Sequence, residues 1–105
     1  MDEFQIALCT CADLEQAERI ARHLVEHRLA ACVNLLPAVR SIYRWQDAVE
    51  SATEILLIIK TDSARSRDVQ IAVEQLHSYE VPEFLVLPVA GGSEAYLAWL
   101  RTCLK

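Results

Sequence analysis

The 105-residue sequence predicts an α+β fold, a ferredoxin-like split βαβ two-layer sandwich with an extended β-hairpin and a C-terminal helix. Patterns of period 2 and period 3.6 follow one another in the order strand, helix, strand, strand, helix, strand, helix. Only 2 glycines and 3 prolines interrupt a chain that is 53% hydrophobic, so the connections should be short. The length suits one hydrophobic core, and we expect residues 1–105 to form a single domain.

The first strand and the first helix are predicted within residues 4–28. Residues 4–10 alternate in period 2, which is typical of a strand. Asp13 stands at the expected N-cap of a helix, and Gln16 follows at the capping-box position. The next apolar residues recur on one helical face: Leu14, Ala17, Ile20, Ala21, Leu24 and Val25. We therefore expect a helix that ends near Arg28.

Residues 31–46 predict one long strand with an interruption. Pro37 has no N–H group to give to a sheet, so the strand should bend there. Residues 47–52 form the expected turn, and because they contain no Asn-Gly or Asp-Gly pair, we do not expect a tight two-residue hairpin. A partner strand follows over residues 53–61 and is apolar on both faces.

The second half of the chain repeats the helix and strand pattern. Thr61 or Asp62 is expected to cap a helix with these core positions: Val69, Ala72, Val73 and Leu76. A polar loop over residues 76–83 follows, and then a strand over residues 84–89. Ser93 opens a last helix with an apolar stripe: Tyr96, Leu97, Leu100 and Leu104.

The face of the sheet away from the helices is predicted to be apolar. Three strands are apolar on both faces, and Tyr43 and Trp45 add aromatic rings on the hairpin face opposite Ile42 and Arg44. A single chain would then expose an apolar patch beyond the few hundred Å² usual for soluble monomers. We expect these faces to pack against sister subunits in a closed ring, unless the last helix covers part of the patch.

Charge and composition exclude several classes of function. With 15 acidic and 10 basic residues the net charge is −5, and no basic cluster is present, so we expect no nucleic-acid partner. No apolar run is long enough to span a membrane, and residues 1–4 lack the features of a secretion signal, which predicts a cytoplasmic protein. In that reducing compartment the four cysteines should be thiols. Since no catalytic motif is present, we expect no enzyme.

The chain resembles the CutA family of divalent-ion tolerance proteins in stretches that match in order and spacing: residues 29–34, 41–45, 54–61, 76–83 and 96–99. The match as a whole extends over almost the whole chain. The resemblance implies a cytoplasmic homotrimer of ferredoxin-like subunits whose long hairpins wrap their neighbours. It also implies a function in the tolerance of copper and other divalent metals.

The resemblance further implies metal ligands at Cys9, at the end of the first strand, and at His77, in the loop before the last strand. Thiolate and imidazole suit copper, and thiolate favours Cu(I). Where some relatives carry two adjacent histidines, this chain has Leu76 before His77. Either Cys11 or Glu80 then completes the ligand shell, or the affinity is low. The predicted cofactor is copper or another divalent cation.

Each of these residues also has a purely structural interpretation. Cys9 has the properties of a small buried hydrophobe, and Cys11 points the same way two residues later, which packing explains as well as a shared metal does. His77 is equally suited to capping the carboxyl end of the second helix. Glu80 and Glu83 have no evident partner, so we interpret them as solvated or as interface residues.

Other histidines and cysteines are weaker candidates for ligands. His23 and His27 share a helical face at a spacing that allows chelation, but no third ligand lies nearby in the sequence, which favours a solvated face. Cys32 and Cys103 are expected to be core or interface thiols.

Two hypotheses of function follow. The first is a trimeric protein that buffers or senses copper through Cys9 and His77 and does not catalyse a reaction. The second is a trimeric signalling scaffold whose clefts between subunits hold a small molecule or a protein partner. The scaffold would use exposed cations and aromatic rings: Arg28, Arg40, Lys60, Tyr43, Arg44 and Trp45. The last three of these residues are also of types that are common at subunit interfaces.

Overall fold

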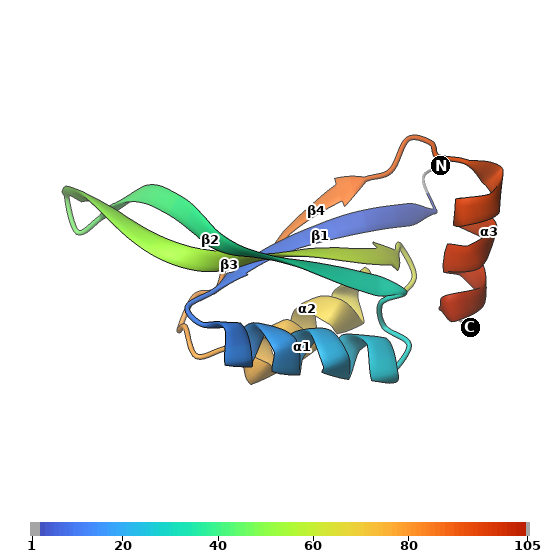
Figure 1. Ribbon diagram of the computed structural model, residues 1–105, viewed down its shortest axis with the longest axis horizontal. Helices are drawn as coiled ribbons and strands as arrows, with labels where there is room; N and C mark the ends of the chain where they lie inside the picture. The colour runs from blue at the N-terminus through green and yellow to red at the C-terminus, as the bar shows by residue number, and fades with distance from the viewer. Residues whose placement is uncertain (1–2, 105) are drawn as a thin grey trace.

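The computed structural model describes residues 3–104 as a four-stranded antiparallel sheet with two helices on one face and a third helix at one end (Figure 1). The elements are β1 (Phe4–Cys11), α1 (Leu14–Glu26), β2 (Cys32–Trp45), β3 (Ala48–Asp62), α2 (Ser66–Leu76), β4 (Leu85–Pro88) and α3 (Glu94–Cys103). The strand order is β2-β3-β1-β4, which confirms the predicted split βαβ fold and the order of its elements.

Helix α1 begins as the sequence predicts and ends two residues before the expected position. The Asp13 side chain accepts a hydrogen bond of 2.8 Å from the backbone N–H of Gln16, so the predicted N-cap is confirmed. The helix ends at Glu26 because Arg28 adopts a left-handed conformation with φ 57°. The N–H groups of Arg28 and Leu29 then bond carbonyls of the last turn, as in a Schellman motif.

Strands β2 and β3 form a long hairpin that projects from the body of the molecule (Figure 1) and gives it extents of 44 × 25 × 22 Å. The predicted bend in β2 is present. The pairing register shifts between Leu36 and Val39, where Pro37 and Ala38 form a bulge and Ala38 has φ 62°. The bulge leaves β2 as one interrupted strand, as expected from Pro37.

The tip of this hairpin contradicts the sequence prediction. Trp45 pairs with Ala48, so the turn consists of Gln46 and Asp47 alone, and β3 begins at Ala48 and not at residue 53. Gln46 and Asp47 have φ values of 49° and 66°, the two left-handed conformations of a type I′ turn. The expectation of a looser turn over residues 47–52 was wrong because the turn forms without the usual Asn-Gly or Asp-Gly pair.

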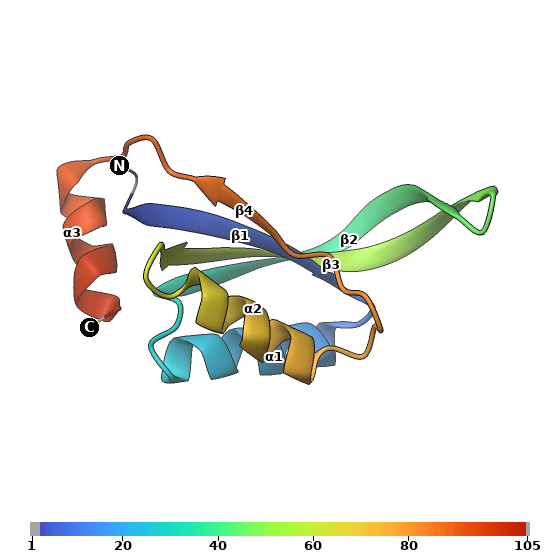
Figure 2. The ribbon, with the colours of Figure 1, turned by 180° about the vertical axis from the view of Figure 1, so that it is seen from behind.

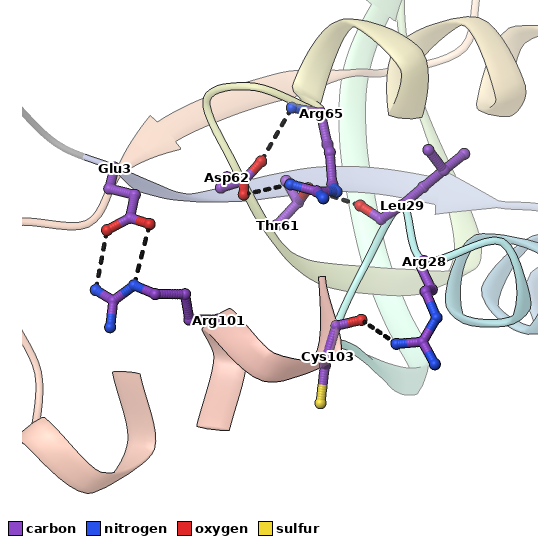
Figure 3. Close-up of polar contacts among 8 residues, drawn as sticks. All are labelled: Glu3, Arg28, Leu29, Thr61, Asp62, Arg65, Arg101 and Cys103. Carbon is purple, nitrogen blue, oxygen red and sulfur yellow. Dashed lines mark hydrogen bonds and ion pairs between the residues drawn. The ribbon is translucent and has the colours of Figure 1, made fainter. Parts of the chain in front are cut away.

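The predicted cap of α2 is also wrong. The N-cap residue of α2 is Arg65, which makes no side-chain capping bond. The Asp62 carboxylate instead accepts the Arg65 backbone N–H at 3.0 Å and its guanidinium at 2.8 Å, which closes the turn before the helix (Figure 3). The Thr61 hydroxyl donates to the carbonyl of Leu29 at 2.7 Å, so it joins β3 to the loop after α1.

The main core lies between the sheet and helices α1 and α2. Its fully buried members include Cys9, Leu57 and Ile59 from the sheet and Ile20 and Leu24 from α1. The predicted α2 core positions Val69, Ala72 and Val73 are buried, and Leu76 packs against the cluster from its edge: all four therefore lie where the helical pattern places them.

Helix α3 packs over one end of the sheet and builds a second, smaller core. Ser93 caps it by accepting the backbone N–H of Tyr96 at 3.2 Å, as the sequence predicts. Leu100 and Leu104 bury Phe4 of β1, and an exposed ion pair of 2.9 Å between Arg101 and Glu3 closes the contact (Figure 3).

The reverse face of the sheet is defined here as the face turned away from α1 and α2. Figures 1 and 2 show both helices on the other side, while α3 covers only the end of the sheet. Strand pairing places the following apolar side chains on the reverse face: Ile6, Leu8, Leu36, Leu56, Ile58, Leu85 and Leu87. Leu85 and Leu87 are 58% and 47% exposed, so the predicted apolar reverse face is present and largely uncovered in the single chain.

Candidate metal centre

Two cysteines and one histidine converge beside the end of β1. The sulfur atoms of Cys9 and Cys11 and a ring nitrogen of His77 all lie within 4.8 Å of one another. Cys9 and Cys11 point into the core because residues two apart in a strand share a face, and both are completely buried. His77 follows the last residue of α2 and is partly buried. The structure therefore brings the two predicted ligands together and adds Cys11.

The backbone carbonyl of Thr10 orients this cluster. His77 Nε2 lies 2.7 Å from the Thr10 oxygen, and the thiol of Cys9 points to the same oxygen at 3.8 Å. The backbone N–H of Tyr79 donates to His77 Nδ1 at 3.0 Å. Since a backbone N–H is only a donor, Nδ1 is the acceptor and the ring proton lies on Nε2, directed at Thr10. His77 is the C-cap residue of α2, as the structural alternative expects, and caps it with its backbone N–H on the Val73 carbonyl at 2.9 Å, while its ring bonds Thr10 and no helix carbonyl.

The loop over residues 77–83 holds the histidine against the sheet. Figures 1 and 2 both place the segment between α2 and β4 beside the turn that joins β1 to α1. The Tyr79 hydroxyl donates to Glu54 Oε2 at 2.9 Å, and its ring lies 4.7 Å from that of His77. The Ser78 hydroxyl bonds the side chain of Gln16 at 3.3 Å. Together with the bond from His77 to Thr10, these contacts tie the loop to β1, α1 and β3.

The two thiols differ in their tendency to ionise. The adjacent Cys11 sulfur, burial and the negative charges of Glu83 and Glu54 all raise the pKa of Cys9. The neighbouring Cys9 thiol lowers the pKa of Cys11, while burial and Asp13 oppose this effect. Cys11 is therefore the thiol that ionises first.

The phenol of Tyr79 is also perturbed. Burial and the hydrogen bond to Glu54 raise the pKa of Tyr79 to about 12. The Glu54 side chain is only 8% exposed, although a carboxylate is normally solvated. Tyr79 supplies its hydrogen bond, so the two residues form a polar contact at the border of the thiol cluster.

The donor set fits a thiophilic metal ion. Metal–sulfur bonds of about 2.3 Å place two sulfurs about 3.8 Å apart in a tetrahedral site and about 4.6 Å apart in a linear one. The donors of Cys9, Cys11 and His77 lie within 4.8 Å, so they need to approach one another by roughly 1 Å or less. Sulfur and imidazole donors suit Cu(I) and Zn²⁺ and do not suit Mg²⁺ or Ca²⁺, which prefer oxygen.

The other carboxylate candidates lie outside this cluster. Among residues 3–104, the group of ligating side chains within 4.8 Å contains neither Glu80 nor Glu83. Both are exposed on the loop, and Glu83 acts on Cys9 only through its charge. Of the two residues proposed to complete the shell, the structure thus places Cys11 and not Glu80 beside Cys9.

The histidine pair of α1 does not form a comparable site. The rings of His23 and His27 are stacked with centroids 4.1 Å apart, and His27 Nδ1 is 2.9 Å from the His23 carbonyl. No third ligating side chain joins them within the described part of the chain.

The aromatic and cationic candidates are spread over the molecule. Tyr43, Arg44 and Trp45 lie exposed near the tip of the hairpin. Lys60 donates to the hydroxyl of Tyr96 at 3.4 Å, far along β3 from that tip. Arg40 bonds Ser51 on the neighbouring strand at 3.4 Å, and Arg28 bonds the carbonyl of Cys103 at the end of α3 at 3.3 Å (Figure 3). The single chain therefore gathers these residues into no common cleft.

Sequence reasoning missed three contributors to the site. They are the Thr10 carbonyl, the phenol of Tyr79 and the buried carboxylate of Glu54. Glu54 carried the only usable signal, because it immediately precedes the uninterrupted apolar run of a predicted strand. A backbone carbonyl such as that of Thr10 has no signature in the sequence.

The family model described as CutA1 divalent ion tolerance protein matches residues 5–103. The divalent-cation tolerance protein CutA of Pectobacterium atrosepticum is 44% identical over 100 residues, which span 95% of this chain and 91% of that protein. The Thermus thermophilus protein of the same description is 46% identical over 97 residues, which span 92% and 94%.

Solved structures agree with these sequence matches. The crystal structure of CutA from Xylella fastidiosa superposes with a TM-score of 0.95 at 40% identity and covers 98% of this chain and 99% of its own. A structure described as the periplasmic divalent cation tolerance protein CutA of Archaeoglobus fulgidus has a TM-score of 0.93 at 36% identity, covering 97% and 99%. In the described part of this chain, no helix is both long and apolar enough to cross a membrane.

Proposed function

Since the chain belongs to the CutA1 divalent ion tolerance family, we propose that it serves metal tolerance by binding copper through Cys9 and His77. The observation that carries this proposal is the convergence of these side chains, from elements far apart in the sequence, to within 4.8 Å. The chemistry is consistent with it, because thiolate and imidazole are ligands that copper prefers. The proposed role is binding, with no catalysed reaction.

Copper titration of the reduced protein tests this proposal directly. The double variant Cys9→Ser with His77→Ala should lose site-specific copper binding in calorimetry, because it removes one sulfur and one nitrogen donor. The matched control is Cys32→Ser with His23→Ala, which removes the same groups outside the cluster and should bind copper as the unmodified chain does. Equal copper affinity of the two double variants would refute the site.

We also propose that the chain acts as a homotrimer. The support is the apolar reverse face, where Leu85 and Leu87 are 58% and 47% exposed, together with the projecting hairpin, where Ile42 is 72% exposed. Burial of such a surface between subunits removes it from water. Sedimentation should give three subunits at micromolar concentration, and Leu87→Glu should weaken the assembly. A stable monomer would contradict the proposal.

A trimeric scaffold is the second candidate function. It is favoured by the exposed Tyr43, Arg44 and Trp45, since aromatic and arginine side chains are typical of binding surfaces. Under this proposal, clefts between subunits hold a small molecule or a protein partner, and copper titration gives no site-specific signal. A copper signal that disappears in the Cys9→Ser, His77→Ala variant decides for the first function.

We place the protein in the cytoplasm. The support is that all four cysteines are free thiols, which a reducing compartment maintains. Cell fractionation tests this placement, and recovery of the protein in an oxidising compartment would overturn it.

A further inference from the structure

The feature that the proposed function leaves unused is the second buried thiol. Cys11 is 0% exposed, and its sulfur lies within 4.8 Å of both the Cys9 sulfur and a nitrogen of His77. Packing alone explains a small side chain at this position, because Ala7 occupies the same face of β1 and is equally buried. Packing does not explain why an imidazole is held against two sulfurs.

The arrangement of hydrogen bonds leaves His77 ready to act as a ligand. Metal-binding histidines usually donate their second ring N–H to a carbonyl or a carboxylate, which fixes the ring. His77 already donates Nε2–H to the Thr10 carbonyl at 2.7 Å, and Thr10 lies between the two cysteines. A metal bond through Nδ1 would keep this contact and displace the N–H of Tyr79, whereas a metal bond through Nε2, the nitrogen beside the carbonyl to which Cys9 points, would displace the Thr10 carbonyl and leave Nδ1 bonded to Tyr79.

We propose that Cys9, Cys11 and His77 form a dithiolate–imidazole centre selective for thiophilic closed-shell ions, with Cu(I) as the copper species bound. This inference rests on the proposed function of the same site and adds Cys11 as a ligand. Two thiolates and one neutral imidazole carry a charge of −2, which suits soft cations and excludes hard ions that require oxygen ligands.

The proton balance of binding follows from this donor set. Each thiol exchanges its S–H bond for a metal–sulfur bond and releases one proton to the buffer. His77 binds as the neutral ring and releases none, because Nδ1 carries no proton in the structure. At a pH at which both free thiols are protonated, one Cu(I) ion should therefore displace two protons from the reduced protein, whereas a site that uses Cys9 alone should displace one. No electrons are transferred, since copper enters as Cu(I).

The first experiment uses the unmodified reduced chain. Cu(I) is supplied as its complex with a competing chelator, and calorimetry in two buffers of different ionisation heat counts the protons released per ion. A count of two supports the dithiolate centre. A count of one overturns it, even if copper binds tightly, and leaves the proposed function standing.

The second experiment compares alanine variants of three cysteines. Cys11→Ala should weaken Cu(I) binding by at least about 100-fold, because loss of even an outer partner of a metal ligand costs 10–100-fold. Cys9→Ala should do the same, and Cys32→Ala is the matched control, since Cys32 is a free thiol outside the cluster. Circular dichroism checks that each variant is folded, and Cys11→Ser replaces any alanine variant that is not.

The outcomes separate the two claims. Loss of binding in Cys9→Ala with unchanged binding in Cys11→Ala would show that Cys11 is not a ligand, and the copper site at Cys9 and His77 would stand. Unchanged binding in both variants, with the same affinity as Cys32→Ala, would overturn the site itself and the proposed function with it.

Discussion

The backbone strain in the bulge of β2 can be tested by a substitution at Ala38. With φ 62° this residue is an exposed, non-glycine residue in the left-handed region, at the register shift between Leu36 and Val39. A Cβ atom there costs roughly 1–2 kcal/mol. Ala38→Gly removes that cost and adds the larger entropy loss of glycine, roughly 0.5–1 kcal/mol. The difference predicts a chain that is about 0.5–1 kcal/mol more stable.

The assay is equilibrium unfolding in urea, followed by circular dichroism at one fixed protein concentration, because any assembly makes stability depend on concentration. The control is Ala52→Gly on the opposite strand, which pairs with Ser41 and has no positive φ. That variant gains no relief of strain and should lose about 0.5–1 kcal/mol. If both substitutions destabilise the chain by the same amount, the argument from backbone strain is refuted.

Three further predictions concern the core and two titrating groups. Leu57→Ala, at a side chain with 0% exposure, should destabilise the chain by about 2–5 kcal/mol in the same urea assay. The Tyr79 phenol should titrate near pH 12, above its ordinary value, and Glu54→Gln should lower that pKa; ultraviolet difference spectra against Tyr79→Phe check this. Because the pKa of the Tyr79 phenol is raised in the folded chain, the protonated phenol contributes stability that is present below pH 10 and is lost as pH rises through 12. The Arg101 hydrogen bond lowers the pKa of Glu3, so this pair contributes stability above the ordinary carboxyl pKa that is lost as pH falls through the folded value. Because the pair is exposed, its loss in Glu3→Gln should be small and should vanish in high salt.

Local patterns predicted most of the fold because their causes are local. The Asp13 cap needs only a side chain three residues from an N–H group, and the bend at Pro37 needs only a missing donor. The turn at Gln46 and Asp47 was not predictable in this way. Its backbone is imposed by the long β2–β3 ladder, which pairs Trp45 with Ala48. Asp47 is of a type that tolerates the left-handed region, but Gln46 is not, so the sequence gives no signal for this turn.

In the candidate site, too, the sequence predicted the features that have local causes and not those that depend on long-range contacts. Period 2 in β1 predicts that Cys9 and Cys11 share a face, and the structure agrees. The approach of His77 to Thr10 joins residues 67 positions apart, and no spacing in the sequence encodes it. Family resemblance supplied His77 as a candidate, whereas its orientation depends on the fold of the loop.

The two faces of β1 keep the proposed metal centre and the proposed subunit contact apart. Cys9 and Cys11 point into the core, while Ile6 and Leu8 lie on the reverse face between β3 and β4. Since neighbouring residues of a strand point in opposite directions, a substitution on the reverse face leaves both sulfurs in place. Assembly and copper binding are therefore separable within one strand, and a variant that loses its partners and still binds Cu(I) would show that each subunit holds a complete site.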